Sequence, residues 1–220
     1  MHFLAVASIA SNNVQNLLKW VASEPGAALG PLRFDTSKAG AGCGSFSTRA
    51  LMDGEMLITL PASALLTAKG MSSFQDEWGE RAALASVIAR ETLSPSSPCT
   101  AAYCACLPNC PSDQLHMLWW SPAQVAMLAG TSAEAECNSL RDEVDDVCTR
   151  LSEGLELDVQ YKAFGKDKVH DAVRAGYVSV LSRAFNFDKE GRELALIPVL
   201  DLLQHGNTPL CGVLLRNQRR

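Results

Sequence analysis

Apolar residues recur at steps of three and four along much of the chain, which is the spacing of one face of an α-helix. Residues 12–22, 81–93 and 133–151 each follow this pattern, and a last repeat in residues 169–181 runs into Arg183. In residues 133–151 the apolar positions are Cys137, Leu140, Val144, Val147, Cys148 and Leu151. The sequence therefore predicts a series of amphipathic helices in the middle of the chain.

Two other stretches have the composition of β-structure. Residues 46–61 predict two short strands joined by a turn at Asp53-Gly54, because Asp-Gly suits a hairpin turn that requires positive φ. Residues 194–200 are nearly all apolar and predict a short buried strand. The chain as a whole is thus predicted to be α+β, with β-rich pieces on either side of the helices.

Polar residues come directly after the predicted buried strand, where the chain would leave the core. They are Asp201, Gln204 and His205, and Arg183 ends the helix that precedes the strand. A structural role is one interpretation: Asp201 and Gln204 have the spacing of a helix-capping pair, and a cation such as Arg183 suits the negative end of a helix. A binding site is the other, and a cap can hold a site in place.

Length and hydropathy indicate an ordinary globular protein. The 220 residues allow one or two domains with a sizeable core, and 47% of them are hydrophobic while 20% are charged. No apolar run approaches the roughly 18 residues of a transmembrane helix, so we expect no membrane partner. Residues 3–10 form a short apolar stretch without a preceding basic region, which argues against a signal peptide.

The charge distribution excludes a general nucleic-acid binder, which would show a basic surface. The net charge is −5, and residues 134–158 hold nine acidic residues against two arginines. The acidic stretch predicts a solvated face of an amphipathic helix. Its alternative is a recognition surface for a basic substrate.

Eight cysteines are spread along the chain, four of them in the pattern C-x4-C-x-C-x3-C: Cys43, Cys99, Cys104, Cys106, Cys110, Cys137, Cys148 and Cys211. Clustered thiolates can hold zinc, but this pattern lacks the paired C-x2-C knuckles of common zinc modules. We therefore predict small, buried, unpaired cysteines in a reduced intracellular protein with no structural metal.

The polar loop and the helix end together resemble the SET-domain methyltransferases, in the branch that includes the Rubisco large-subunit methyltransferase. That branch has a Ser-Arg-x-Phe helix end, then an apolar strand reading Pro-x-x-Asp-x-x-Asn-His. The corresponding residues here are Ser182-Arg183-x-Phe185 and Pro198-x-x-Asp201-x-x-Gln204-His205. A Gly-x-Gly and a Tyr-x-x-x-Leu-Pro segment of the branch are also matched, by Gly42, Gly44 and Tyr103-Cys104-Ala105-Cys106-Leu107-Pro108.

This resemblance implies a SET-type β-rich core that is split by a long helical insert. Residues 1–64 would hold an N-terminal helix and the first part of the core, residues 65–175 the insert, and residues 176–220 the second part. The C-terminal part of the core would be missing. The resemblance also implies that the Gly42–Gly44 loop lies beside Arg183 and His205.

The implied activity is S-adenosylmethionine-dependent N-methylation of lysine in a non-histone protein. Arg183 would contact the methionine carboxylate, Gln204 and His205 would line the methionine and adenine parts, and Asp201 would brace the loop. Main-chain contacts to the cofactor would come from Gly42, Cys43 and Gly44. The chain departs from the family at Gln204, where Asn is usual.

A second departure concerns the catalytic tyrosine, which the family carries in a later Tyr-Gly segment. No such segment follows Pro209, and Tyr103, Tyr161 and Tyr177 lie elsewhere in the pattern. We therefore assign no catalytic residue and expect this chain alone to be inactive or feeble. A non-catalytic SET-like interaction module is the alternative, and a cysteine-based metal protein ranks last. We expect a monomer in the cytoplasm, nucleus or plastid, with a protein lysine as its partner.

Overall fold

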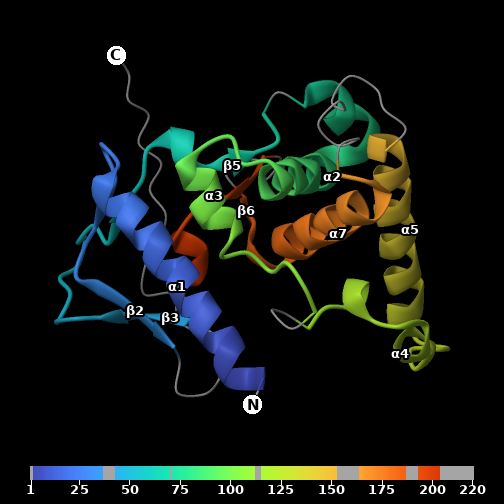
Figure 1. Cartoon of the computed structure of the whole chain (residues 1–220), viewed down its shortest axis with the longest axis horizontal. Coiled ribbons are helices and arrows are strands. Elements are labelled where there is room, and N and C mark those ends of the chain that lie inside the picture. The colour runs from blue at the N-terminus through green and yellow to red at the C-terminus, as the bar shows by residue number, and fades with distance from the viewer. Residues whose placement is uncertain are drawn as a thin grey trace.

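The structure, a computed structural model, describes residues 2–36, 43–69, 71–111, 115–152, 164–186 and 193–203. Its helices are α1 (His2–Ser23), α2 (Ser72–Leu93), α3 (Pro98–Cys104), α4 (Pro122–Ala126), α5 (Ser132–Ser152) and α7 (Lys166–Arg183), with 3₁₀ helices η1 (Ala62–Ala64), η2 (Met117–Trp119) and η3 (Leu200–Leu202). Its strands are β1 (Ala28–Leu29), β2 (Leu32–Thr36), β3 (Cys43–Ser47), β4 (Ile58–Thr59), β5 (Leu66–Thr67), β6 (Phe185–Asn186) and β7 (Leu194–Leu196). The fold is mixed α+β with small antiparallel sheets (Figure 1).

The strands form two pairs and one sheet of three strands. β1 pairs with β4, and β2 pairs with β3. In the third sheet β7 lies between β5 and β6, with Leu196 opposite Leu66 and Ala195 opposite Phe185. This sheet therefore joins a segment that precedes helices α2 to α7 with two segments that follow them.

The predicted hairpin in residues 46–61 is wrong, although its turn exists. Gly54 has φ 74°, and the Glu55 N–H donates to the Met52 carbonyl at 3.2 Å. The strands on either side of this turn do not pair with each other, because β3 pairs with β2 and β4 with β1. The turn depends on local chemistry, but both strands beside it pair with strands that precede them in the chain, so the turn does not determine which strands meet.

The helical predictions are confirmed. Residues 12–22, 81–93 and 133–151 lie within α1, α2 and α5, and the last repeat lies within α7. All six apolar positions named in α5 are buried. One position in α7 differs: Leu181 is 42% exposed, since it lies on the outer side of the last turn.

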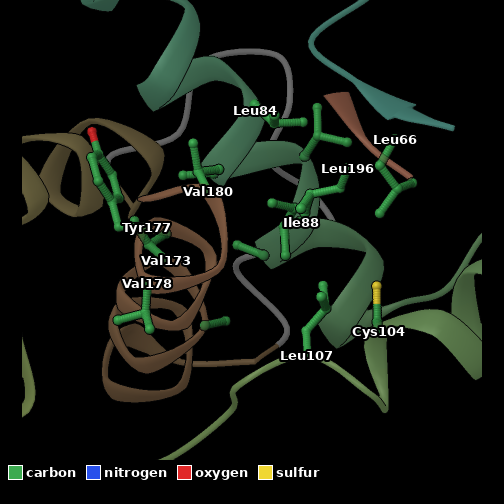
Figure 2. Packing of buried hydrophobic residues seen from close by; sticks show 14 of the residues in the cluster. Leu66, Leu84, Ile88, Cys104, Leu107, Val173, Tyr177, Val178, Val180 and Leu196 are labelled. Atoms are coloured by element: carbon green, nitrogen blue, oxygen red, sulfur yellow. The ribbon is translucent and has the colours of Figure 1, made fainter. Parts of the chain in front are cut away.

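The core is built where α2 crosses α7, and α5 packs against α7 as well (Figures 1 and 2). The crossing is so close that a Cβ on Gly176 would lie 2.4 Å from the Ala85 carbonyl oxygen. Figure 2 shows side chains of α2, α7, β5 and β7 that meet there, among them Leu84, Ile88, Val173, Tyr177, Leu66 and Leu196.

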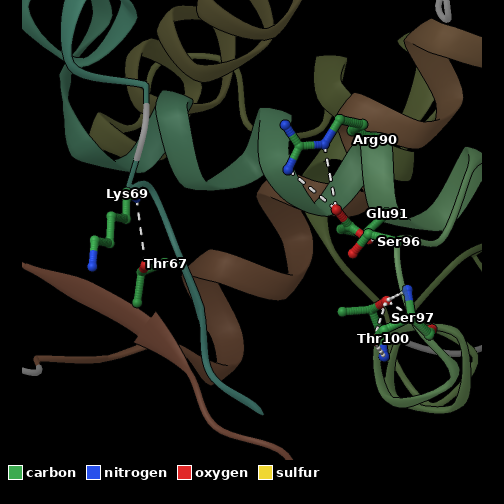
Figure 3. Close-up of polar contacts among 7 residues, drawn as sticks. All are labelled: Thr67, Lys69, Arg90, Glu91, Ser96, Ser97 and Thr100. Atoms are coloured by element: carbon green, nitrogen blue, oxygen red, sulfur yellow. Dashed lines mark hydrogen bonds and ion pairs between the residues drawn. The ribbon is translucent and has the colours of Figure 1, made fainter. Parts of the chain in front are cut away.

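A polar clamp connects α2 to α3 (Figure 3). The buried Glu91 carboxylate accepts the Ser96 N–H at 2.7 Å and a guanidinium N–H of Arg90 at 3.1 Å. Ser97 then caps α3 by accepting the Thr100 N–H at 3.1 Å, while the Thr100 hydroxyl accepts the Ser97 N–H at 3.0 Å. These bonds fix the start of α3 and hence the direction in which Tyr103 enters the core.

Among the helices that the structure describes, none combines the length and the apolar character needed to cross a membrane.

Candidate functional site

The Arg183–Asp201 ion pair is the centre of the candidate site. Arg183 ends α7, and its Nη1 donates to Asp201 Oδ2 at 3.2 Å. The Asp201 side chain is 0% exposed, whereas that of Arg183 is 24% exposed. The enclosed carboxylate thus holds the guanidinium through Nη1, while the Arg183 side chain as a whole remains partly exposed.

Backbone strain at Val199 helps to place Asp201. Val199 has φ 67° and ψ −39°, and within the described ranges no other non-glycine residue has a positive φ. A buried β-branched residue adopts this conformation only where its surroundings force it, and such strain concentrates at functional sites. Val199 is also the N-cap of η3, and Asp201 lies within η3. This corrects the interpretation in which Asp201 was the N-cap of a short helix.

Tyr103 of α3 brings a third polar group to this pair. Its hydroxyl is buried, and neither that oxygen nor Asp201 Oδ1 has a partner of hydrogen-bond geometry in the part of the chain described. The two groups still lie close enough to affect each other's pKa. Burial raises the pKa of Asp201, and Arg183 and the Tyr103 hydroxyl oppose that rise by favouring the carboxylate. Burial likewise raises the pKa of Tyr103.

Sequence reasoning missed Tyr103 as a site residue. The Tyr-x-x-x-Leu-Pro segment contains it, but the resemblance assigns that tyrosine no role. Its hydroxyl meets Asp201 only through the fold, because 97 residues separate the two along the chain.

Strand β3, which contains Cys43 and Gly44 of the predicted glycine loop, lies next to the segment that carries Asp201. β3, which begins at Cys43 and contains the buried Gly44, packs against η3. Segments that are far apart in the sequence are thereby brought to Asp201. The predicted site residues Gly42, Gln204 and His205 lie outside the described residues, so their place beside Arg183 stays a prediction.

The clustered cysteines lie in and around α3. Cys99 and Cys104 are buried, and burial raises their pKa to about 11 and about 12, so both remain protonated thiols at neutral pH. Over the described residues, no three His, Cys, Asp or Glu side chains are grouped so as to hold a metal ion.

No protein-family model and no curated protein matches this sequence. Solved structures match its fold. The SET domain of LSMT bound to lysine and AdoHcy matches with a TM-score of 0.68 and 18% identity, over 90% of this chain and 44% of that one. Rubisco LSMT bound to AdoMet matches with a TM-score of 0.66 and 18% identity, over 89% of this chain and 45% of that one.

These matches concern the fold, since the identities are low. The chain spans less than half the length of the LSMT chains. Its small antiparallel sheets and its intervening helices therefore belong to one architecture: this chain has the fold of the Rubisco LSMT SET domain over 90% of its length.

Proposed function

We propose that the chain belongs to a SET-type, S-adenosylmethionine-dependent N-methyltransferase that acts on lysine in a non-histone protein, with residues 65–175 as the insert. The observation that carries this proposal is the partly exposed side chain of Arg183, whose guanidinium is held through Nη1 by the buried Asp201. One matched structure of the same fold holds lysine and AdoHcy, and another holds AdoMet.

The residues present fit the methionine end of such a cofactor. A guanidinium presents several N–H donors in a planar fork that matches a carboxylate, and Asp201 engages Nη1 of Arg183. By resemblance, further contacts to the cofactor would come from the main chain at the start of β3, which packs against η3. The resemblance assigns the methionine and adenine parts to Gln204 and His205, and Gln204 places its amide one methylene further out than the usual Asn.

When bound, the cofactor would supply a methyl group activated on a sulfonium. Transfer forms a C–N bond to the lysine while the C–S bond breaks, and the bonding electron pair stays on sulfur. The lysine must attack as a neutral amine, which a narrow desolvated channel favours by lowering its pKa. In this scheme Arg183 and Asp201 bind and orient, and alignment of the reactants supplies much of the rate enhancement.

A non-catalytic SET-like interaction module is the second candidate, favoured by the surroundings of the tyrosines. In the described part of the chain, Tyr103 and Tyr177 are both buried, and the Tyr177 hydroxyl donates to Glu143 at 2.9 Å. Both hydroxyls are enclosed by protein, which favours a structural role for these tyrosines over one in catalysis. In such a module the helical insert would mediate contacts with a protein partner.

Calorimetric titration with S-adenosylhomocysteine tests the proposal. We expect binding by the unchanged chain and a loss of about tenfold or more in Arg183→Ala, because a charge-assisted carboxylate contact disappears. Arg183→Lys should bind with intermediate affinity, since lysine lacks the planar fork. Arg150→Ala is the matched control, because it removes an arginine whose surface ion pair with Glu77 joins α5 to α2, and it should leave the affinity unchanged.

Two results separate the candidates. An unchanged chain that fails to bind, or binding that Arg183→Ala leaves intact, contradicts the cofactor site. Transfer of a radiolabelled methyl group to lysine in a protein extract, lost in Arg183→Ala, supports the methyltransferase. Binding without transfer is expected of this chain alone under both candidates, so the test is repeated with the chain fused to the Tyr-Gly-containing C-terminal part of a SET enzyme. Transfer gained by that fusion and lost in Arg183→Ala supports the methyltransferase, and binding still without transfer supports the interaction module.

A further inference from the structure

The Tyr103 hydroxyl and Asp201 Oδ1 are two buried oxygens without a hydrogen-bond partner among the described residues. We propose that Tyr103 is a positioning residue that acts through Asp201: its hydroxyl donates to Oδ1 and thereby holds the carboxylate that orients the guanidinium. This inference rests on the proposed function, because it takes Arg183 as the contact for the cofactor carboxylate.

The chemistry of the two oxygens favours this bond. A buried hydroxyl or carboxylate oxygen without a partner loses its hydration and gains nothing in return, so nearly all such groups in folded proteins are paired. Arg183 donates to Oδ2 of Asp201, so Oδ1 is the oxygen that lacks a donor. A phenolic O–H is a donor and Oδ1 is an acceptor, so a small reorientation would satisfy both atoms.

The groups that face Asp201 come from separate elements. Arg183 comes from α7 and Tyr103 from α3. β3 also packs against η3. No residue of β3 is of a charged type, and Cys43 is its titratable residue. Burial raises the pKa of Asp201, and Arg183 and the Tyr103 hydroxyl oppose it. Removing the hydroxyl should therefore raise the pKa of Asp201 further.

Both sides of the proposed bond rest on fixed structure. The clamp at Glu91 and the cap at Ser97 hold the start of α3, and Asn13 Nδ2 of α1 donates to the Ala105 carbonyl at 2.6 Å just beyond its end. On the other side, the strained Val199 fixes the direction of η3. A hydroxyl delivered by so constrained a helix can restrict the carboxylate, which is what positioning requires.

The test combines Tyr103→Phe, Asp201→Asn and the double variant in the 220-residue chain. Phenylalanine keeps the buried ring and removes only the hydroxyl. We expect Tyr103→Phe to weaken S-adenosylhomocysteine binding about tenfold. In the Asp201→Asn background the same substitution should have no further effect, because two residues that act through one contact are not additive.

A carbon-13 NMR titration of the Asp201 carboxyl gives a readout that a purely structural role would not move. Tyr103→Phe should raise the Asp201 pKa above that of the unchanged chain. Tyr177→Phe is the matched control: it removes another buried hydroxyl, one bonded to Glu143, and should alter neither the Asp201 pKa nor the affinity.

The proposal is overturned if Tyr103→Phe leaves the Asp201 pKa unchanged, or if its effect on binding adds fully to that of Asp201→Asn. If the unchanged chain does not bind S-adenosylhomocysteine, the proposed function fails. The pKa comparison then decides the inference by itself: a rise supports the Tyr103–Asp201 bond, and no rise overturns it.

Discussion

The buried tyrosines illustrate at the residue scale how surroundings decide what one side chain does. The Tyr177 hydroxyl donates to Glu143, whose carboxylate also pairs with Arg81 at 2.5 Å. The Tyr103 hydroxyl faces Asp201 without such a bond. A satisfied buried group stabilises the fold, whereas an unsatisfied one costs free energy. Tyr177 therefore serves the core, whereas Tyr103 keeps a donor for the bond to Asp201 that we propose.

Glu91 should make stability depend on pH. Burial raises its pKa, but bonds from Ser96 and Arg90 outweigh burial, so the pKa in the folded protein is lowered. Ionised Glu91 therefore stabilises the fold above the pKa of an unfolded glutamate, and this contribution is lost as pH falls through the lower folded value. Glu91→Gln should cost about 1–3 kcal/mol near neutral pH, and less in acid.

Urea unfolding at about pH 7 and about pH 3.5, on either side of a free glutamate pKa, checks this difference. Glu77→Gln serves as control, because Glu77 makes an exposed ion pair with Arg150 that should contribute little. If the difference in free energy of unfolding between Glu91→Gln and the unchanged chain is the same at both pH values, the titration of Glu91 does not cause the pH dependence of stability.

Cysteine reactivity gives a second prediction at this scale. Cys104 and Cys148 are buried, and burial raises the pKa of each to about 12. Since the thiolate is the reactive form, both should be alkylated by iodoacetamide far more slowly in the folded chain than in about 6 M urea. Mass spectrometry of timed samples measures this. Equal rates in the folded and unfolded chain would mean that these thiols are open to solvent.

The elements differ in how far the sequence could predict them. The helices were predictable because their evidence is local: the apolar positions of α5 repeat at helical spacing, and all six proved buried. Strand pairing was not, because β3 and β4 each join a strand that precedes them in the chain. Likewise Arg183 and Asp201 belong to one sequence pattern, whereas Tyr103 reaches Asp201 only through packing.

The crossing of α2 and α7 predicts an unusual response at Gly176. Helix propensity alone would make Gly176→Ala stabilising by about 1 kcal/mol. The new Cβ would lie 2.4 Å from the Ala85 carbonyl oxygen, which is backbone and can yield only if α2 moves. We therefore expect a loss of about 1–3 kcal/mol, as for overpacking in other cores.

Thermal unfolding of Gly176→Ala beside Thr149→Ala makes this comparison. Thr149 is exposed on α5, so its replacement reports helix propensity without a new contact. A Gly176→Ala variant as stable as, or more stable than, the unchanged chain would mean that the two helices can separate at no cost.

At the scale of the whole molecule, one core joins segments from both ends of the described chain. Buried residues of α1, α2, α5, α7, β7 and η3 form a single hydrophobic cluster. The sheet of β5, β7 and β6 pairs a strand that precedes helices α2 to α7 with two strands that follow them. Helix α1 packs on α3 (Figure 1). The β-rich and helical parts thus share their buried surface, and neither has a core of its own.

This shared core predicts cooperative unfolding. Leu17 of α1 and Leu84 of α2 are both fully buried, so Leu17→Ala and Leu84→Ala should each cost about 2–5 kcal/mol. Both variants should shift one transition that tryptophan fluorescence and far-ultraviolet circular dichroism report at the same urea concentration. Leu181→Ala, at a largely exposed site, should shift it little. Two separate transitions, with Leu17→Ala moving only one of them, would show that α1 and α2 belong to independently folding units.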